Sequence, residues 1–258
     1  MGGPALVISD ATVGYGKGNG SVAVISSINA SLNGGELVAL IGRNGAGKST
    51  LLRTLAAYQL PLSGKIELSG ENVKEMAPCD IARNISVVLT EVPQPVLNVR
   101  ELVSLGRMPY TNLLGRLSAR DNDIVSGAME EMGILHLAGR KVSALSDGER
   151  QKCMIAKALA QETPVIMLDE PTAYLDYPSK VHLMSMLGSL AHKKGKAVLV
   201  STHDIELALR LADRIWLVDN GSMHCGTVAE LSSLGILHSF IDSDTMHYNA
   251  KENRIEII

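Results

Sequence analysis

The sequence predicts an α/β fold in which a mostly parallel sheet carries an inserted helical segment. Short apolar runs alternate with helical patterns along most of the 258 residues, which is typical of parallel strands covered by helices. From about residue 94 to residue 161 the helical patterns follow one another without an intervening strand. We therefore expect one domain over residues 1–258, with an α/β core at residues 1–90 and 162–258 and a helical subdomain at residues 91–161.

The predicted strands are short apolar runs bounded by Gly, Asn and Asp. They cover residues 5–8, 36–41, 65–68, 85–89, 165–168, 197–200 and 215–218. The predicted helices show apolar residues at helical spacing, and they cover residues 49–58, 99–105, 121–132, 148–161, 179–192 and 205–212. Strand and helix alternate outside the helical segment, so neighbouring strands are expected to run parallel.

Composition and charge exclude several classes of protein. With 46% hydrophobic and 20% charged residues the chain is an ordinary globular protein, and its net charge of −3 gives no broad attraction to nucleic acid. The three cysteines lie far apart without metal-ligand or CxxC spacing, so we expect them to be reduced and buried. No leader pattern and no apolar stretch of bilayer length is found, so we expect a cytoplasmic protein that reaches a membrane only through a partner.

A glycine-rich loop follows the predicted strand at residues 36–41 and opens the next helix. It reads GRNGAGKST and satisfies the GxxxxGK[ST] pattern of a phosphate-binding loop. Glycines let successive backbone N–H groups converge on phosphate oxygens, and the N-terminus of the helix adds partial positive charge. Lys48 is expected to hold the β and γ phosphates of a nucleotide, and Ser49 to bind Mg²⁺. The predicted nucleotide-binding residues of the loop are Gly42, Asn44, Gly45, Ala46, Gly47, Lys48, Ser49 and Thr50.

An apolar strand at residues 165–168 ends in two carboxylates, Asp169 and Glu170. The carboxyl ends of the strands form the edge of an open α/β sheet at which ligands bind. Asp169 is expected to bind Mg²⁺, and Glu170 to orient or polarise the attacking water.

The segment LSDGERQ, residues 145–151, begins a predicted helix just upstream of these acids. Ser146 fits an N-cap, and Glu149 completes a capping box. The segment also resembles the LSGGQ signature of ABC ATPases. This resemblance implies a P-loop NTPase (RecA-like) core with an antiparallel β part near the N-terminus. It further implies that the signature residues Ser146, Asp147, Gly148 and Glu149 bind the γ phosphate of ATP held by a second copy of the chain.

Other landmarks of this family occur in the same order along the whole chain. Tyr15 matches the aromatic residue that stacks on adenine, although a lone tyrosine beside a strand is also explained by packing. Asp176, in the segment AYLD, resembles the D-loop residue that crosses the dimer interface. His203 follows the strand at residues 197–200 and matches the family's switch histidine, a catalytic group.

Two departures from the family pattern concern charge. Where the family has a Q-loop glutamine, this chain has Glu91, with Gln94 as a nearby alternative. Glu91 offers a carboxylate for catalysis and for Mg²⁺, but it adds negative charge beside Asp169 and Glu170. In the signature, Asp147 and Glu149 replace a glycine and a glutamine, so we expect weaker nucleotide binding and modest turnover.

The stretch NVRELVSLGRMPY, residues 98–110, resembles the corresponding part of ATPases that serve importers of iron siderophores, haem and cobalamin. Packing of Leu102, Val103 and Leu105, with a helix end at Gly106 and Pro109, also explains this stretch. The resemblance implies a head-to-tail homodimer at the cytoplasmic face of the inner membrane. Its partners would be two transmembrane permease subunits and, indirectly, a substrate-binding protein, with ATP and Mg²⁺ bound and no nucleic acid. Alternatives are the ATPase of an exporter or lipid-extraction complex, a soluble ABC protein without a transport role, and a regulatory module that does not hydrolyse ATP.

The C-terminal stretch, residues 234–258, contains His238, His247 and a strand-like pattern at residues 254–258. The sequence allows a closing strand or a contact surface. The two histidines lack the usual spacing of metal ligands in sequence, so we expect a structural role.

Overall fold

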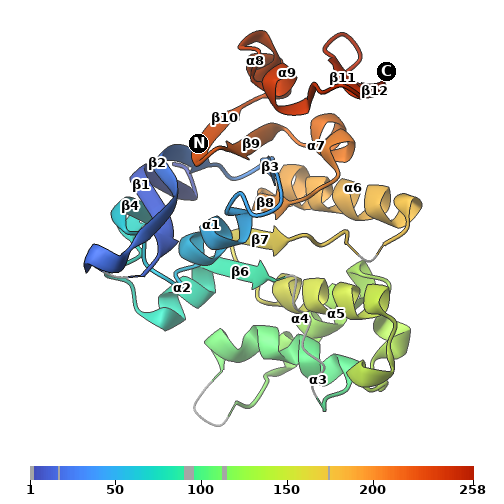
Figure 1. Cartoon of the computed structure of the whole chain (residues 1–258). Helices are drawn as coiled ribbons and strands as arrows, with labels where there is room; N and C mark the ends of the chain where they lie inside the picture. Colours follow the sequence, from blue (N-terminus) through green and yellow to red (C-terminus); the bar gives the residue numbers. More distant parts are fainter. Residues whose placement is uncertain (1–2, 17, 90–95, 112–114, 174) are drawn as a thin grey trace.

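The computed structural model describes residues 3–16, 18–89, 96–111, 115–173 and 175–258 (Figure 1). Its strands form a six-stranded sheet in the order β10-β9-β3-β8-β7-β6, a four-stranded sheet in the order β2-β1-β4-β5, and the hairpin β11-β12. The strands are β1 (Leu6–Tyr15), β2 (Val22–Leu32), β3 (Leu37–Gly42), β4 (Ser63–Leu68), β5 (Glu71–Asn72), β6 (Ile85–Val88), β7 (Val165–Asp169), β8 (Ala197–Ser201), β9 (Arg214–Asp219), β10 (Ser222–Gly226), β11 (Met246–Asn249) and β12 (Arg254–Ile257).

The six-stranded sheet is parallel except for its edge strand β10, which pairs antiparallel with β9. Every residue of β3, β7 and β8 is buried, because both faces of this sheet are covered. On one face Val38 and Leu40 pack with α1 and the antiparallel sheet, and on the other face Ala39 and Ile41 pack with the helices that follow β6. The predicted α/β class, the mostly parallel sheet and the antiparallel part near the N-terminus are all confirmed.

The helices cover the central sheet and fill the segment between β6 and β7 (Figure 1). They are α1 (Lys48–Leu55), α2 (Pro78–Asn84), α3 (Val99–Ser104), α4 (Ala119–Glu131), α5 (Asp147–Ala160), α6 (Tyr177–Lys194), α7 (Ile205–Leu211), α8 (Val228–Ser233) and α9 (Ile236–Ile241). Short 3-10 turns are η1 (Gly18–Gly20), η2 (Leu105–Tyr110), η3 (Leu135–Leu137) and η4 (Val142–Ala144). None of the helices within the described ranges is both long and apolar enough to span a membrane.

Three helices between β6 and β7 begin with capping boxes, formed by Asn98 at α3, Ser118 at α4 and Ser146 at α5. Each cap pairs the side chain of the first residue with a backbone N–H three residues on, which fixes where the helix starts. The described residues of this segment contain helices and turns and no strand beyond the isolated bridge between Asn98 and Lys141.

Two packing expectations from the sequence were wrong. Leu105 is 42% exposed rather than packed, because α3 ends at Ser104 and the chain continues as the turn η2, with Pro109 inside it. Of the three cysteines, Cys153 is buried and Cys225 is partly buried, but Cys79 is exposed on α2. Burial raises the pKa of the Cys153 thiol to about 11 and that of the Cys225 thiol to about 12, so both stay neutral.

Candidate nucleotide-binding site

The glycine-rich loop connects β3, which ends at Gly42, to α1, which begins at Lys48. A Cβ on Gly42 would lie 2.6 Å from the Val218 carbonyl oxygen, and one on Gly47 would lie 2.4 Å from Val24 Cγ1. Gly47 also has a φ of 103°, in the left-handed region that favours glycine. Glycine at these two positions therefore allows the sharp turn that brings the loop over the start of α1.

The Lys48 side chain is buried, with 5% exposure. Its Nζ donates to the Gly42 carbonyl oxygen at 2.9 Å and to the Arg43 carbonyl oxygen at 3.3 Å. Burial lowers the pKa of Lys48, and the nearby carboxylates of Glu170 and Asp169 partly oppose this shift. The loop thus holds a desolvated cation, whose charged form would be stabilised by an anion.

Two neighbouring parallel strands position the carboxylates. Asp169 at the end of β7 lies opposite Ser201 at the end of β8. Ser201 Oγ donates to Asp169 Oδ1 at 2.6 Å and accepts the backbone N–H of Glu170 at 2.9 Å. His203 Nε2 makes a close polar contact with Glu170 Oε1. One buried serine therefore connects the two acids, and His203 contacts the second of them.

The loop, Glu170 and His203 line an open cavity of about 350 Å³, whereas the predicted residues Gly42 and Asp169 are not among those that line it. Its lining combines the loop with the end of β1, one residue of β2 and the segments after β7 and β8: Tyr15, Val24, Asn44, Gly45, Ala46, Gly47, Lys48, Ser49, Thr50, Glu170 and His203. The Tyr15 hydroxyl contacts Thr50 Oγ1, while the Tyr15 side chain stays 53% exposed. Most residues predicted from separate parts of the sequence thus lie around one cavity.

The signature residues lie elsewhere. Ser146 caps α5, and its backbone N–H donates to Glu149 Oε2 at 2.8 Å, which lowers the pKa of Glu149. Asp147 forms an ion pair with Arg150. Asp176 caps α6 by accepting the Ser179 N–H at 3.0 Å. Among the described residues, the lining of the cavity includes neither the signature, residues 146–149, nor Asp176.

Glu91 and Gln94, the two candidates for the Q-loop position, lie outside the described residues. Their role remains a prediction from the sequence.

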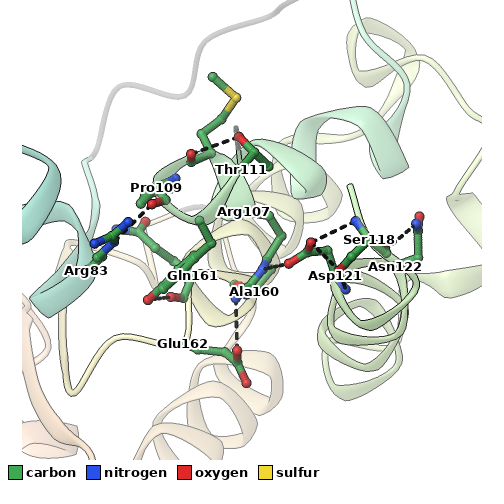
Figure 2. Close-up of polar contacts among 12 residues, drawn as sticks. Arg83, Arg107, Pro109, Thr111, Ser118, Asp121, Asn122, Ala160, Gln161 and Glu162 are labelled. Carbon is green, nitrogen blue, oxygen red and sulfur yellow. Dashed lines mark hydrogen bonds and ion pairs between the residues drawn. The ribbon is translucent and has the colours of Figure 1, made fainter. Parts of the chain in front are cut away.

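The stretch at residues 98–110 is held by contacts of Arg107, which is 4% exposed (Figure 2). Arg107 donates to Asp121 Oδ1 at 2.9 Å, to the Ala160 carbonyl oxygen at 2.8 Å and to Glu162 Oε2 at 3.0 Å. Its guanidinium also lies 4.3 Å from the centre of the Tyr110 ring. These contacts join η2 to α4 and to the end of α5 (Figure 2).

Further contacts tie η2 to α2 and the core. The Pro109 carbonyl oxygen accepts a hydrogen bond from Arg83 Nε at 3.1 Å (Figure 2). Tyr110 Oη donates to the Gln161 carbonyl oxygen at 2.9 Å. A Cβ on Gly106 would lie 2.3 Å from the Lys157 carbonyl oxygen, so η2 and α5 approach as closely as a glycine permits. The importer-like stretch therefore connects the helical segment to the core.

Sequence reasoning missed two residues that hold other groups in place: Ser201, beside the carboxylates of the site, and Arg107, between η2 and the helices packed against it. Ser201 acts through the strand order β8-β7, which the sequence alone does not show. Arg107 was part of a recognised pattern, but its partners Asp121 and Glu162 lie 14 and 55 residues away along the chain. The available signal was an arginine just after the predicted helix at residues 99–105.

Comparisons with known proteins agree with this geometry. Residues 25–173 match the ABC transporter family. An uncharacterized ABC transporter ATP-binding protein of Methanocaldococcus jannaschii is 44% identical over 216 residues, 83% of this chain and 73% of that protein. The ferric enterobactin transport ATP-binding protein FepC of Escherichia coli strain K12 is 38% identical over 213 residues, 82% of this chain and 77% of FepC.

Two solved structures have the same fold at 26% identity. An ATP-binding subunit of an ABC transporter superposes with a TM-score of 0.78, covering 90% of this chain and 94% of that one. A dimeric bacterial ABC transporter cassette superposes with a TM-score of 0.76, covering 86% of this chain and 98% of that one. The chain therefore belongs to the ABC transporter family, as one of its ATP-binding subunits, which are ATPases coupled to transport.

Proposed function

We propose that two copies of this chain close head-to-tail on ATP and Mg²⁺ and, through docked permease subunits, power a membrane importer for an iron-siderophore, haem or cobalamin-type substrate. The observation that supports nucleotide binding and hydrolysis is the cavity lined by the glycine-rich loop with its buried Lys48, by Glu170 and by His203. The remaining parts rest on family membership and on the relatives reported above.

The loop residues fit a triphosphate with its metal ion. Lys48 supplies a buried positive charge for the β and γ phosphates, and the adenine is assigned to the half-exposed Tyr15 ring. Ser49 is exposed at the cavity, and the Asp169 carboxylate is fixed by Ser201. Hydroxyl and carboxylate oxygens of this kind are the donors that Mg²⁺ prefers, and Glu91 would add a third. When bound, Mg²⁺ would neutralise charge on the β and γ phosphate oxygens.

Hydrolysis is assigned to Glu170 and His203. Glu170 accepts or orients the proton of the attacking water, and the contact with His203 holds the glutamate side chain in one orientation. Ser201 fixes the backbone of Glu170 through its N–H. Phosphoryl transfer depends on positioning and electrostatics, so each of these contacts is expected to matter more for turnover than for ATP binding.

A second copy is part of the proposal because the signature residues are not among the described residues that line the cavity of their own chain. Ser146, Asp147, Gly148 and Glu149 lie at the start of α5 and Asp176 at the start of α6, outside the cavity lining of the described chain. In the proposed dimer they complete the partner's site, with the Ser146 hydroxyl and the α5 N-terminus on the γ phosphate. Asp147 is paired with Arg150, which reduces its repulsion of the nucleotide.

The first test measures Mg²⁺-dependent ATP hydrolysis and molecular mass in solution for the wild type and Glu170→Gln. The wild type should hydrolyse ATP, and Glu170→Gln should bind ATP, lose turnover and accumulate as a dimer. Glu75→Gln is the matched control, because this exposed glutamate lies outside the cavity lining and should change neither property. Equal activity of wild type and Glu170→Gln, or no ATP-dependent dimer in either, would contradict the proposed site.

The second test addresses transport direction. The chain is expected at the cytoplasmic face of the cell membrane, bound to a polytopic permease with which it should copurify. In proteoliposomes with the chain outside, ATP should move a ferric siderophore, haem or cobalamin from the lumen to the outside, which is the import direction. Lys48→Ala should abolish this movement. ATP-driven accumulation of a lipid or solute inside the lumen would instead support the exporter alternative.

A further inference from the structure

Three potential metal ligands from the C-terminal part of the chain meet at one point. His238 lies on α9, Asp242 ends that helix, and His247 lies on β11. One ligand atom from each lies within 4.8 Å of the others. His238 and Asp242 are one helical turn apart, and the chain reversal between α9 and β11 brings His247 to them.

The distances in this cluster are long for direct ion pairs and compatible with ligands around a common ion, and His238 Nδ1 forms a long hydrogen bond with Asp242 Oδ2. His238 Nδ1 lies 3.3 Å from Asp242 Oδ2, and His247 Nδ1 lies 3.4 Å from the same oxygen. A charge-assisted N–H···O bond is shorter, about 2.7–2.9 Å. Two ligands bound tetrahedrally at about 2.0–2.1 Å from one Zn²⁺ ion lie roughly 3.3–3.4 Å apart. The two nitrogen–oxygen distances match that separation.

Contacts with the buried Tyr248 hold Asp242 and His238 in place. Asp242 Oδ1 accepts the Tyr248 N–H at 2.7 Å, which leaves Oδ2 facing the histidines. Tyr248 is fully buried, its ring meets the His238 ring edge-on at 5.2 Å between centroids, and its hydroxyl donates to Asn253 at 2.9 Å. An orienting hydrogen bond on the second oxygen of a carboxylate is a common feature of metal sites.

We propose that His238, Asp242 and His247 form a binding site for one divalent transition-metal ion of the Zn²⁺ class, with solvent completing its coordination. Two imidazole nitrogens and a carboxylate oxygen suit late first-row metals, whereas Mg²⁺ and Ca²⁺ prefer oxygen ligands alone. His247 and Asp242 are exposed, so an ion and its water ligand can reach the site. This site is independent of the proposed transport function.

The position of the site gives it a structural consequence. Met246, adjacent to His247, and Ile255 and Ile257 of β12 line a second cavity together with Glu170 and His203. A bound ion would join α9 to β11 and so restrain the hairpin that forms one wall of this cavity. Metal binding is therefore expected to stabilise the C-terminal hairpin beside the candidate catalytic residues.

The test uses the full-length, nucleotide-free protein in excess Mg²⁺, with Co²⁺ and Zn²⁺ alone as probes. Both proteins compared carry Cys79→Ser, because the exposed Cys79 thiol is another potential ligand. Co²⁺ should give a visible absorption band that saturates at one ion per chain, and Zn²⁺ should displace it and raise the melting temperature. His247→Ala should lower the affinity by about tenfold or more and remove the band, as expected for the loss of a ligand.

His224→Ala is the matched control, because this exposed histidine on β10 lies outside the cluster and should change nothing. If His247→Ala does not fold, Asp242→Asn serves instead, since its amide oxygen can still accept the Tyr248 N–H while the anionic ligand is lost. Unchanged Co²⁺ affinity in both cluster variants, or loss of the band in His224→Ala, would overturn the assignment. Absence of saturable binding to the Cys79→Ser protein would overturn it as well.

Discussion

Replacement of Arg107 by methionine should loosen the packing of η2 against α4 and the end of α5, with a loss of stability that can be calculated from the structure. The variant loses the donors to Asp121 Oδ1 and to the Ala160 carbonyl oxygen, both of which are buried. Removing one partner of a buried ion pair costs about 3–5 kcal/mol, because the other charge stays desolvated. The pair with Glu162, whose side chain is 45% exposed, adds at most about 1 kcal/mol. Asp121 keeps its hydrogen bonds from Ser118, so we expect a total near the middle of that range, about 4 kcal/mol.

The loss is measured as the change in free energy of unfolding by urea, with the fluorescence of the single, buried Trp216 as the probe. For a chain of this size 1 kcal/mol shifts the melting temperature by about 2–4 °C, so the variant should melt roughly 8–16 °C lower. Arg107→Lys should lose about half as much, because an ammonium lacks the planar fork that reaches several acceptors. The exposed Arg53→Met serves as the control.

A loss below about 1 kcal/mol for Arg107→Met would refute the buried-pair argument, because solvent would then have replaced the lost donors. A double-mutant cycle with Asp121→Asn separates the pair from the rest of the loss. A coupling energy near zero between the two substitutions would place the cost in packing instead.

Three further predictions concern single positions. Ser201→Ala removes the donor to Asp169 and should lower kcat about 10–100-fold with little change in KM for ATP, measured by steady-state kinetics; an unchanged kcat would exclude a positioning role. Gly106→Ala places a methyl group against the Lys157 carbonyl and should cost about 1–3 kcal/mol in urea unfolding, whereas a neutral result would show that η2 can move away. Hydrogen bonds from Ser118 and from Arg107, with the charge of Arg107, hold the pKa of Asp121 at about 2. Because this is below the unfolded value of about 3.9, the stability advantage of wild type over Asp121→Asn should be full above about pH 5, fall as the pH drops toward 2 and be lost by about pH 1; an advantage at pH 2 as large as that at pH 5 would contradict this pKa.

The core of the fold could be predicted because its central strands are apolar along almost their whole length. β3, β7 and β8 are fully buried, so their sequence runs were unambiguous. β2 was missed because only part of it is buried and its pairing with β1 contains register shifts. Such a strand has no clean alternation, and its existence depends on the neighbour that covers it.

The candidate site could likewise be predicted only where it is formed by residues close together in the sequence. The loop at residues 42–50 is local, so its spacing predicted the cavity around Lys48 and Ser49. Contacts that depend on strand order or chain reversal could not be predicted, and these include the pairing of Ser201 with Asp169 and the approach of His238 to His247. Local patterns identify which residues carry the chemistry, while the tertiary structure decides what holds them.

The backbone at Glu170 links the fold to the proposed chemistry. Glu170 has a φ of 51°, a left-handed conformation that costs a residue with a Cβ about 1–2 kcal/mol. Its N–H donates to both the hydroxyl and the carbonyl oxygen of Ser201, at 2.9 Å and 3.2 Å, and these bonds offset the cost. Glycine would adopt this conformation without strain, but it would remove the carboxylate from the cavity and from His203. The neighbouring strand thus keeps a carboxylate at the lining of the cavity and in contact with His203, which is where the proposed hydrolysis requires it.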